Sequence, residues 1–399
     1  MSKASPKCLI VTAELPYPPA SGGSLRVWGL LRGLHAAGYG LTMICCQSGE
    51  VLPPLAQIAR VVPLSVAPKG KTQRLRTLLT TQQPDIAIRL FDPHVLDTIA
   101  ELLRAEDFDF VQFEGIETAC YLTPLRTQFP SLKLVFDTFN AEAVMQRTIA
   151  QIDSQTPRRW LRAVYSYVQS QRIAAYERQL CHHADLVIAV SDEDQAHLAA
   201  HGASTPLEVV PSGITVSEYA PPSGAREDGL LVFTGKMDYR PNIDAVEWLV
   251  REVLPHIPQA RLQVVGQQPT DRVRALASER VEITGRVPQV QPYLQAAAVY
   301  VAPLRMGSGT RLKLLEAMAC GCAIVATPLA ASGLSHGVER VMRIADTAER
   351  FAAAVRSLLE QPRERAALGS AARDYVQQHY DWSAITPRMV AAHQRMLHG

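Results

Sequence analysis

The sequence lacks several features that would place it in a specialised class of protein. No apolar window approaches the length of a membrane span, and the apolar run at 8–13 is too short for a secretory signal. The net charge of +2 gives no reason to expect nucleic acid as a partner. The 11 histidines include no HExxH or similar pair. We therefore expect a protein that is soluble, or at most in peripheral contact with the cytoplasmic face of a membrane, and that needs no metal and no cofactor.

Cysteine is also used sparingly, and its pattern excludes a disulfide framework. The seven cysteines form no CxxC pair, and an odd number without a leader favours reduced thiols in a cytoplasmic protein. Cys320 and Cys322 flank a glycine and could suggest a metal pair, but further ligands are missing nearby. We expect Cys8, Cys45 and Cys46, which lie in apolar strand-like runs, to be buried.

The length and the apolar pattern predict two α/β domains. The 399 residues are 47% hydrophobic and 20% charged, which is too much chain for one ordinary core. Short apolar runs alternate with helical patterns in both halves, which favours two Rossmann-like, doubly wound parallel sheets facing a cleft. The predicted boundaries are a first domain at 1–215, a linker at 216–229, a second domain at 230–380, and a helix at 381–399 that packs back on the first domain.

The expected strands and helices follow from the apolar runs and from the glycine, proline and polar residues that separate them. A helix after Gly22 and Gly23 has Leu25, Trp28, Leu31, Leu34 and His35 on one face and ends at Gly38. The predicted strands lie at 8–12, 41–46, 108–113, 132–136, 186–190, 208–210, 230–234, 261–265, 281–284, 299–303 and 323–327. The other predicted helices lie at 157–182, 243–253, 270–278, 290–297, from about 310, and 382–397.

The helix expected at 157–182 begins with a basic and aromatic group. Arg158, Arg159, Trp160 and Arg162 lie in its first turns. One interpretation is contact with an anionic membrane that carries a lipid-linked acceptor. The favoured one is a solvated face with Trp160 packed inward.

The segment 303–321 is the most informative part of the chain. It is typical of a strand, a glycine loop and a helix that begins near Thr310. The small residues Gly307, Ser308 and Gly309 let a ligand approach the main chain, and the helix start favours an anion. Two cations, Arg311 and Lys313, fall in the first turn, and Glu316 follows Lys313 by three residues. Cations for phosphate beside a carboxylate for hydroxyls indicate a nucleotide or sugar-phosphate site.

With these motifs placed, the chain resembles a GT-B glycosyltransferase of the family 4, or group 1, retaining type. The resemblance rests on 233–242, on the glycine loop and its helix, and on the phrase Val209-Val210-Pro211-Ser212-Gly213-Ile214 before the linker. It implies transfer of a sugar, with retention and without a metal, from a nucleotide-diphosphate sugar to a glycan or lipid-linked saccharide. It also implies a place in polysaccharide or glycolipid assembly.

Three departures from the family pattern bear on the site. Ser308 stands where the family usually has a first glutamate, while Glu316 keeps the second, which binds ribose hydroxyls in the family. Lys236 matches one of two diphosphate-gripping cations, but Pro241 stands in place of the other. The family histidine of the first domain is missing, with Glu114 at one of its usual places.

The sequence and the resemblance together give a set of candidate residues. The proposed catalytic residues are Lys236, Arg311, Lys313 and Glu114. The proposed donor-binding residues are Gly235, Arg240, Gly266, Arg286, Val287, Gly307, Ser308, Gly309, Thr310 and Glu316. Gly22 and Gly23, taken as a flexible loop, and Asn140 are proposed for the acceptor or the diphosphate. Glu114, Asp137, Asn140 and Glu142, each taken singly, are better explained by structural roles.

Two other functions stay open at this stage. A nucleotide-sugar 2-epimerase has a similar two-domain fold but needs acids and bases that we cannot assign. A non-catalytic nucleotide-sugar-binding protein is suggested by Ser308 and by the missing histidine. A dehydrogenase is disfavoured because no GxGxxG follows the first strand.

Overall fold

The computed structural model divides the chain into two compact units. It describes residues 5–67, 69–70, 76–77, 80–154, 160–202, 204–306, 311–334 and 337–398. Unit 1 takes the chain as far as Ser212 and again from Ile385, and unit 2 takes Gly213–Ala384. The chain therefore passes from one unit to the other twice.

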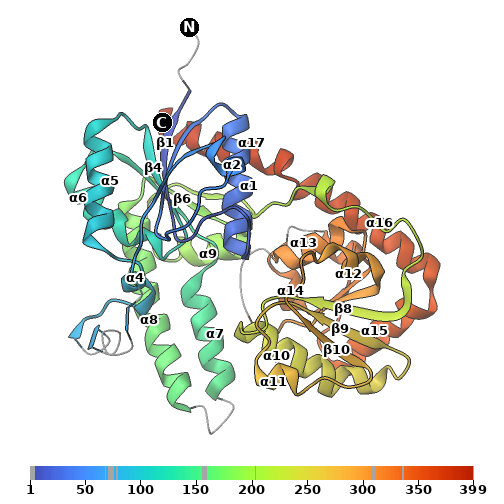
Figure 1. Ribbon diagram of the computed structural model, residues 1–399. Helices are drawn as coiled ribbons and strands as arrows, with labels where there is room; N and C mark the ends of the chain where they lie inside the picture. Colours follow the sequence, from blue (N-terminus) through green and yellow to red (C-terminus); the bar gives the residue numbers. More distant parts are fainter. Residues whose placement is uncertain are drawn as a thin grey trace. The chain divides into compact units, whose positions relative to one another are not determined.

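Unit 1 is a parallel sheet with helices on both faces (Figure 1). Its described strands follow the order β3-β2-β1-β4-β5-β6-β7, so the strand order reverses between β1 and β4. Such a switch point is where open α/β sheets bind ligands. The strands are β1 (Lys7–Thr12), β2 (Gly40–Cys45), β3 (Arg60–Pro63), β4 (Phe110–Glu114), β5 (Lys133–Asp137), β6 (Leu186–Ala189) and β7 (Leu207–Val209).

The helices of unit 1 cover a sheet whose strands are buried on both sides. Residues 8–11 of β1 are fully buried, which is the ordinary result of a continuous apolar run in a parallel strand. The helices are α1 (Gly22–Ala36), α2 (Pro53–Ala56), α4 (Asp85–Arg89), α5 (Pro93–Ala105), α6 (Leu122–Gln128), α7 (Glu142–Ser154), α8 (Trp160–His183) and α9 (Asp192–Ala199).

Helix α17 (Trp382–His398) begins in unit 2 and continues into unit 1. Its buried residues in unit 1 include Ile385, Met389 and His393. The ring of His393 lies 4.6 Å from that of Phe110 on β4. The predicted return of this helix to the first domain is confirmed.

Unit 2 repeats the architecture with a second parallel sheet. The order of its described strands is β10-β9-β8-β11-β12-β13, and the switch point lies between β8 and β11. The carboxyl ends of β8, β9 and β10 therefore share one edge. The strands are β8 (Glu227–Thr234), β9 (Arg261–Val265), β10 (Val281–Gly285), β11 (Ala297–Ala302), β12 (Ile324–Ala326) and β13 (Arg343–Ile344).

The helices of unit 2 differ from the predictions in two places. The helix expected at 270–278 is one turn, because the N–H groups of Ser278 and Val281 donate to each other's carbonyls and form a tight turn. The helix expected at 243–253 begins earlier and ends in a π-helical turn (Leu249–Val253). The helices are α10 (Arg240–Trp248), α11 (Asp271–Arg274), α12 (Gln291–Ala296), α13 (Leu312–Ala319), α14 (Pro328–Ala331), α15 (Ala348–Glu360) and α16 (Pro362–His379).

Helix α8 corrects the favoured interpretation of the basic and aromatic group. Trp160 does not pack inward, because 59% of it is exposed. The buried positions in this half of the helix are the small or polar residues Ala163, Ser166 and Gln169, which leave the large side chains outside. Pro157, Arg158 and Arg159 lie outside the described residues.

None of the helices in the described parts of the chain combines the length and the apolar character that a membrane crossing requires.

Candidate functional site

The carboxyl edge of the sheet in unit 2 is closed by glycines that touch one another. A Cβ on Gly266 would lie 1.7 Å from the carbonyl oxygen of Gly235, so no side chain fits there. The Gly266 N–H donates to the carbonyl of Gly285 at 3.2 Å, which ties the ends of β9 and β10 together. The structure thus brings the predicted Gly235 and Gly266 together.

Lys313 reaches this edge from the first turn of α13. Its Nζ donates to Asn242 Oδ1 at 2.5 Å and lies 4.6 Å from the centre of the Phe233 ring. A Cβ on Gly235 would lie 2.8 Å from the same Nζ. Burial, and then the charge of Arg311, lower the pKa of Lys313 to about 7. An arriving diphosphate would favour the charged form of this lysine.

Asn242 is a site residue that the sequence did not single out. It is buried in α10, and its Nδ2 donates to the carbonyl of Lys236 at 2.9 Å. Because its other amide atom accepts from Lys313, Asn242 joins the loop after β8 to α13. The one available signal was an amide directly after Pro241 in the first turn of a helix.

Glu316 lies one turn further along α13, as its spacing predicts. Its Oε1 accepts a hydrogen bond from the Tyr219 hydroxyl at 3.1 Å. Burial raises the pKa of Glu316, while Tyr219 and then Lys313 oppose that rise. The Glu316 carboxylate and the Lys313 ammonium are therefore close enough to act on one ligand.

Gly307, Ser308, Gly309 and Thr310 lie outside the described residues. Helix α13 begins at Leu312, with Arg311 at its N-cap position.

The remaining donor-site candidates lie near the ends of β8 and β10. Lys236 follows β8, is half exposed, and lies 3.5 Å from the Asp238 carboxylate. Arg240 is the first residue of α10. Arg286 and Val287 follow β10; Arg286 is exposed, and Val287 packs against the core of unit 2. The roles of these four residues in donor binding stay predictions.

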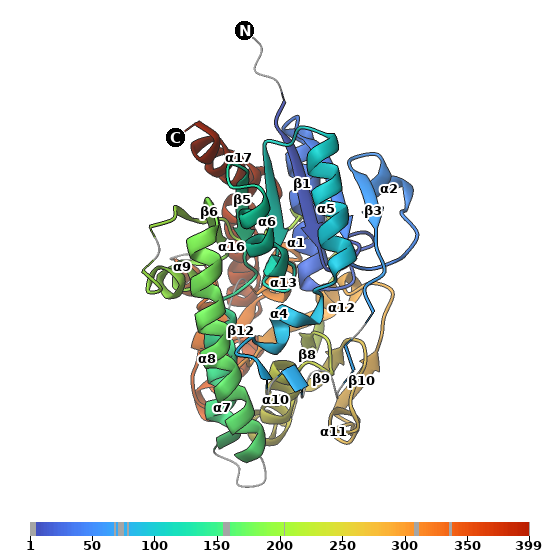
Figure 2. The ribbon, with the colours of Figure 1, turned by 90° about the vertical axis from the view of Figure 1, so that its left-hand side faces the viewer.

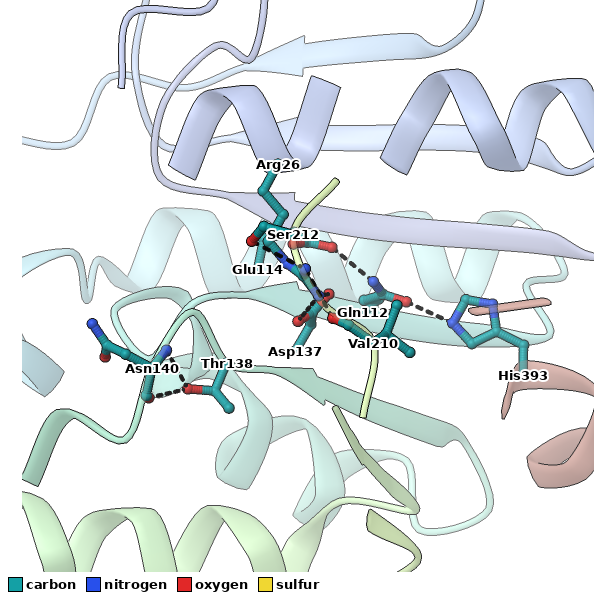
Figure 3. Close-up of polar contacts among 9 residues, drawn as sticks. All are labelled: Arg26, Gln112, Glu114, Asp137, Thr138, Asn140, Val210, Ser212 and His393. Atoms are coloured by element: carbon teal, nitrogen blue, oxygen red, sulfur yellow. Dashed lines mark hydrogen bonds and ion pairs between the residues drawn. The ribbon is translucent and has the colours of Figure 1, made fainter. Parts of the chain in front are cut away.

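Unit 1 holds a buried polar cluster at its switch point (Figure 3). Arg26 on α1 is 1% exposed, and its Nη2 donates to both carboxylate oxygens of Asp137 at 2.8 and 2.9 Å. Its Nη1 donates to the carbonyl of Val210 at 3.0 Å and to Ser212 Oγ at 3.4 Å. Arg26 thus connects α1, the end of β5 and the last residues of unit 1 before the first crossing.

A second chain of hydrogen bonds runs from this cluster to α17 (Figure 3). His393 Nε2 lies 2.9 Å from Gln112 Oε1, and Gln112 Nε2 donates to Glu114 Oε1 at 2.7 Å. Because Gln112 offers its oxygen, His393 donates the proton of Nε2. Burial lowers the pKa of His393 to about 3, so the ring is neutral.

Glu114, a predicted catalytic residue, is enclosed in this cluster. It is 1% exposed, and its Oε2 has no hydrogen-bond partner among the described residues. Burial and the Asp137 carboxylate raise the pKa of Glu114 well above its usual value, which favours the protonated acid. Burial raises the pKa of Asp137 only to about 6, since Arg26 opposes the rise. Asp137 therefore carries the charge that balances Arg26.

The glycines after β1 belong to a helix and not to a flexible loop. Gly22 and Gly23 form the first turn of α1, capped by Ser21, whose hydroxyl donates to Glu14. The Ser21 and Ser24 side chains cap each other's backbone N–H groups, which fixes this turn. His35, predicted on the apolar face of the helix, is exposed.

Asn140 and Glu142 lie after β5. The Asn140 side chain points away from the Arg26 cluster, and its backbone carbonyl accepts from Thr138 Oγ1 at 2.5 Å (Figure 3). Burial raises the pKa of Glu142 to about 7, although Gln146 donates to its carboxylate at 3.3 Å. Roles of these residues toward an acceptor stay predictions. Across the described ranges, no three histidine, cysteine or acidic side chains gather in a way that could hold a metal ion.

Two family models match consecutive stretches of the chain. Residues 21–213 match the model described as glycosyl transferase 4-like domain, and residues 228–361 match glycosyl transferases group 1. The chain belongs to the group 1 glycosyltransferases. The first match covers unit 1 as far as the boundary with unit 2, and the second lies within unit 2. Each unit therefore matches a glycosyltransferase model of its own.

Two curated relatives are about a quarter identical to this chain over the residues that align. A phosphatidyl-myo-inositol mannosyltransferase of Mycolicibacterium smegmatis is 27% identical to this chain. The alignment covers 46% of this chain and 51% of the length of that relative. A GDP-mannose-dependent alpha-(1-6)-phosphatidylinositol monomannoside mannosyltransferase of the same organism is 24% identical over 76% of this chain and 80% of its own.

A solved structure of the same fold covers almost the whole chain. A sucrose-phosphate synthase from Thermosynechococcus elongatus superposes with a TM-score of 0.76, at 19% identity, over 98% of this chain and 99% of its own. The fold is the two-domain GT-B fold, as the sequence predicts.

Proposed function

We propose that this group 1 protein transfers a sugar from a nucleotide-diphosphate sugar to a saccharide or lipid-linked acceptor, with retention and without a metal. The observation that carries the proposal is the contact of Lys313 with Asn242 and Gly235 at the carboxyl edge of the unit 2 sheet, one turn from Glu316. A desolvated cation beside a buried carboxylate suits a diphosphate joined to a ribose. The acceptor is assigned to unit 1.

The hard step is departure of the diphosphate from the anomeric carbon. The bond from that carbon to the diphosphate oxygen breaks, and its electron pair stays on the leaving group. The acceptor oxygen forms the new bond, and its proton passes to the departing phosphate. We assign stabilisation of the developing charge to Lys313, Arg311 and Lys236, three cations that can serve where other transferases use a metal. Glu316 would hold the ribose hydroxyls.

The two relatives support a particular first choice of donor and acceptor. One is named as GDP-mannose-dependent, and both names contain a phosphatidylinositol. We propose a mannosyl donor and a glycolipid-type acceptor as the first pair to test, in surface glycan or glycolipid assembly at the cytoplasmic face of a membrane.

A donor panel followed by a turnover assay tests the proposal. Thermal shifts with UDP-, GDP-, ADP- and dTDP-sugars should select one nucleotide, and candidate acceptors should then release that nucleotide. Interconversion of the free donor without an acceptor would instead indicate a 2-epimerase. Tight donor binding without turnover across a broad acceptor panel would indicate a binding protein.

Donor binding should weaken as the pH rises above 7. Lys313 loses its proton through about pH 7 in the free protein, and the donor binds best to the charged form. The diphosphate of a nucleotide sugar is a diester and keeps its charge through this range. The dissociation constant should therefore rise by up to about tenfold per pH unit above 7. Calorimetry between pH 6 and pH 9 measures it.

The matched control is Lys313→Arg, whose side chain stays charged over the whole range. Its donor affinity should vary little with pH. An equal pH dependence in this variant would assign the titration to another group and contradict the role of Lys313.

A further inference from the structure

Helix α8 exposes an unusual number of large apolar side chains. Of the eight large apolar residues that are exposed in the described parts of the chain, six lie in its first nine positions. We call these six the α8 patch. They are Trp160 (59% exposed), Leu161 (65%), Val164 (53%), Tyr165 (42%), Tyr167 (54%) and Val168 (37%).

In its first half, the distribution of side chains around this helix is the reverse of that in an ordinary surface helix. The inward positions hold Ala163, Ser166, Gln169 and Ser170, which are small or polar. The outward positions follow the helical spacing of a single apolar face, since Leu161, Val164, Tyr165 and Val168 stand at i, i+3, i+4 and i+7. A contiguous exposed apolar face of this kind marks an interaction surface.

The helix belongs to a hairpin that extends away from the sheet of unit 1. Figures 1 and 2 both show α7 and α8 side by side, with the end of α7 and the start of α8 far from the strands. The connection, residues 155–159, lies outside the described residues. Because α8 begins next to it, the α8 patch lies at the far half of the hairpin.

The exposed charge of the hairpin is basic. The described residues of α7 and α8 contain four arginines and three acidic residues, Glu142, Asp153 and Glu177, and all three acidic residues are buried. Arg147 on α7 and Arg162 on α8 are exposed, and Arg162 stands one turn before Tyr165. Aromatic side chains together with arginines are the composition that binds anionic lipid surfaces.

We propose that the α8 patch and its arginines bind the surface of an anionic phospholipid bilayer. Tyrosine and tryptophan settle at the level of the lipid headgroups, and arginine attracts their phosphates. A second copy of the chain fits less well, because a twofold interface would place the arginines of one patch against those of the other. The purpose of this membrane contact would be to hold the protein where a lipid-linked acceptor lies, and in this respect the inference rests on the proposed function.

Flotation with vesicles tests the inference. The full chain should bind vesicles of equal parts phosphatidylcholine and phosphatidylglycerol and should bind phosphatidylcholine alone much more weakly. Trp160→Ser with Tyr167→Ser, and separately Arg147→Glu with Arg162→Glu, should each lower the partition onto anionic vesicles by about tenfold or more. All four positions are exposed, so folding should be retained.

Two matched controls lie in unit 2. Ile344→Ser removes an apolar side chain that is 40% exposed, and Arg350→Glu reverses an exposed arginine. Both should float as the wild type does. Equal binding of the wild type to neutral and anionic vesicles, or an equal loss in the controls, overturns the inference. So does a dimer in sedimentation that the Trp160→Ser and Tyr167→Ser changes dissolve while vesicle binding persists.

The test separates this inference from the proposed transfer. Nucleotide release with a short, water-soluble acceptor should be unchanged in the patch variants, since none of the substituted residues belongs to the donor site. A protein without transfer activity could still float, and a protein that does not float could still transfer.

Discussion

Lys313→Ala should reduce sugar transfer by about two to three orders of magnitude. The substitution removes the cation that Asn242 holds at the carboxyl edge of β8, where the leaving diphosphate is expected. The fold should be retained, because the pKa of Lys313 is lowered to about 7 by burial. A lowered pKa means that the folded protein disfavours the charged form of this lysine more than the unfolded chain does. At neutral pH the charge on Lys313 therefore reduces the stability of the fold, and removing it should not lower the melting temperature. Steady-state kinetics and a thermal melt measure the two effects.

Lys313→Met is the matched variant. It keeps an unbranched chain over the Phe233 ring while it removes the charge, so it separates packing from electrostatics. We expect it to be as inactive as the alanine variant and at least as stable as the wild type. Near-normal turnover in either variant would contradict the assignment of the donor site.

Arg26→Met should lower the free energy of unfolding of unit 1 by about 3–5 kcal/mol. The side chain makes two hydrogen bonds to Asp137 and two more to the segment 210–212. Without it, the Asp137 carboxylate is left buried without its partner cation, next to Glu114. Hydrogen exchange of the β5 amides, together with urea denaturation, measures the loss within unit 1.

The matched control is the double variant Arg26→Met with Asp137→Leu. Replacing both partners of a buried ion pair by apolar groups often restores stability, because no uncompensated charge remains. The double variant should therefore be more stable than Arg26→Met. A single variant within about 1 kcal/mol of the wild type would mean that the pair contributes no more than an exposed one.

The sheets could be predicted from the sequence because their strands are short, continuous apolar runs. The strand at 261–265 has the predicted bounds, and the run at 8–12 differs by one residue from β1. The strands β3 and β13 were missed because each is short and each contains an arginine. A strand at the edge of a sheet has less need of an apolar pattern, so its signal is weaker.

The contacts of the site could not be predicted, because they join residues that are far apart in the sequence. Lys313 and Asn242 are separated by 71 positions, and neither lies in a pattern that specifies the other. The sequence alone would place Arg26 on the surface of an amphipathic helix. Arginine is rarely buried without a charged partner, and the sequence does not show that Asp137 is that partner. Trp160 was placed inward by its hydrophobicity, but the small residues of α8 occupy the buried positions.

The path of α17 has a consequence for synthesis of the protein on the ribosome. Unit 1 needs residues 385–398 to cover Phe110 and to supply His393 to Gln112. The intervening residues of unit 2 must be translated first, which at ~5–20 residues per second takes on the order of ten seconds or more. During that interval the nascent unit 1 exposes an apolar face that only the later segment can close. Premature termination within unit 2 would therefore leave an incomplete first unit that is prone to aggregation and degradation.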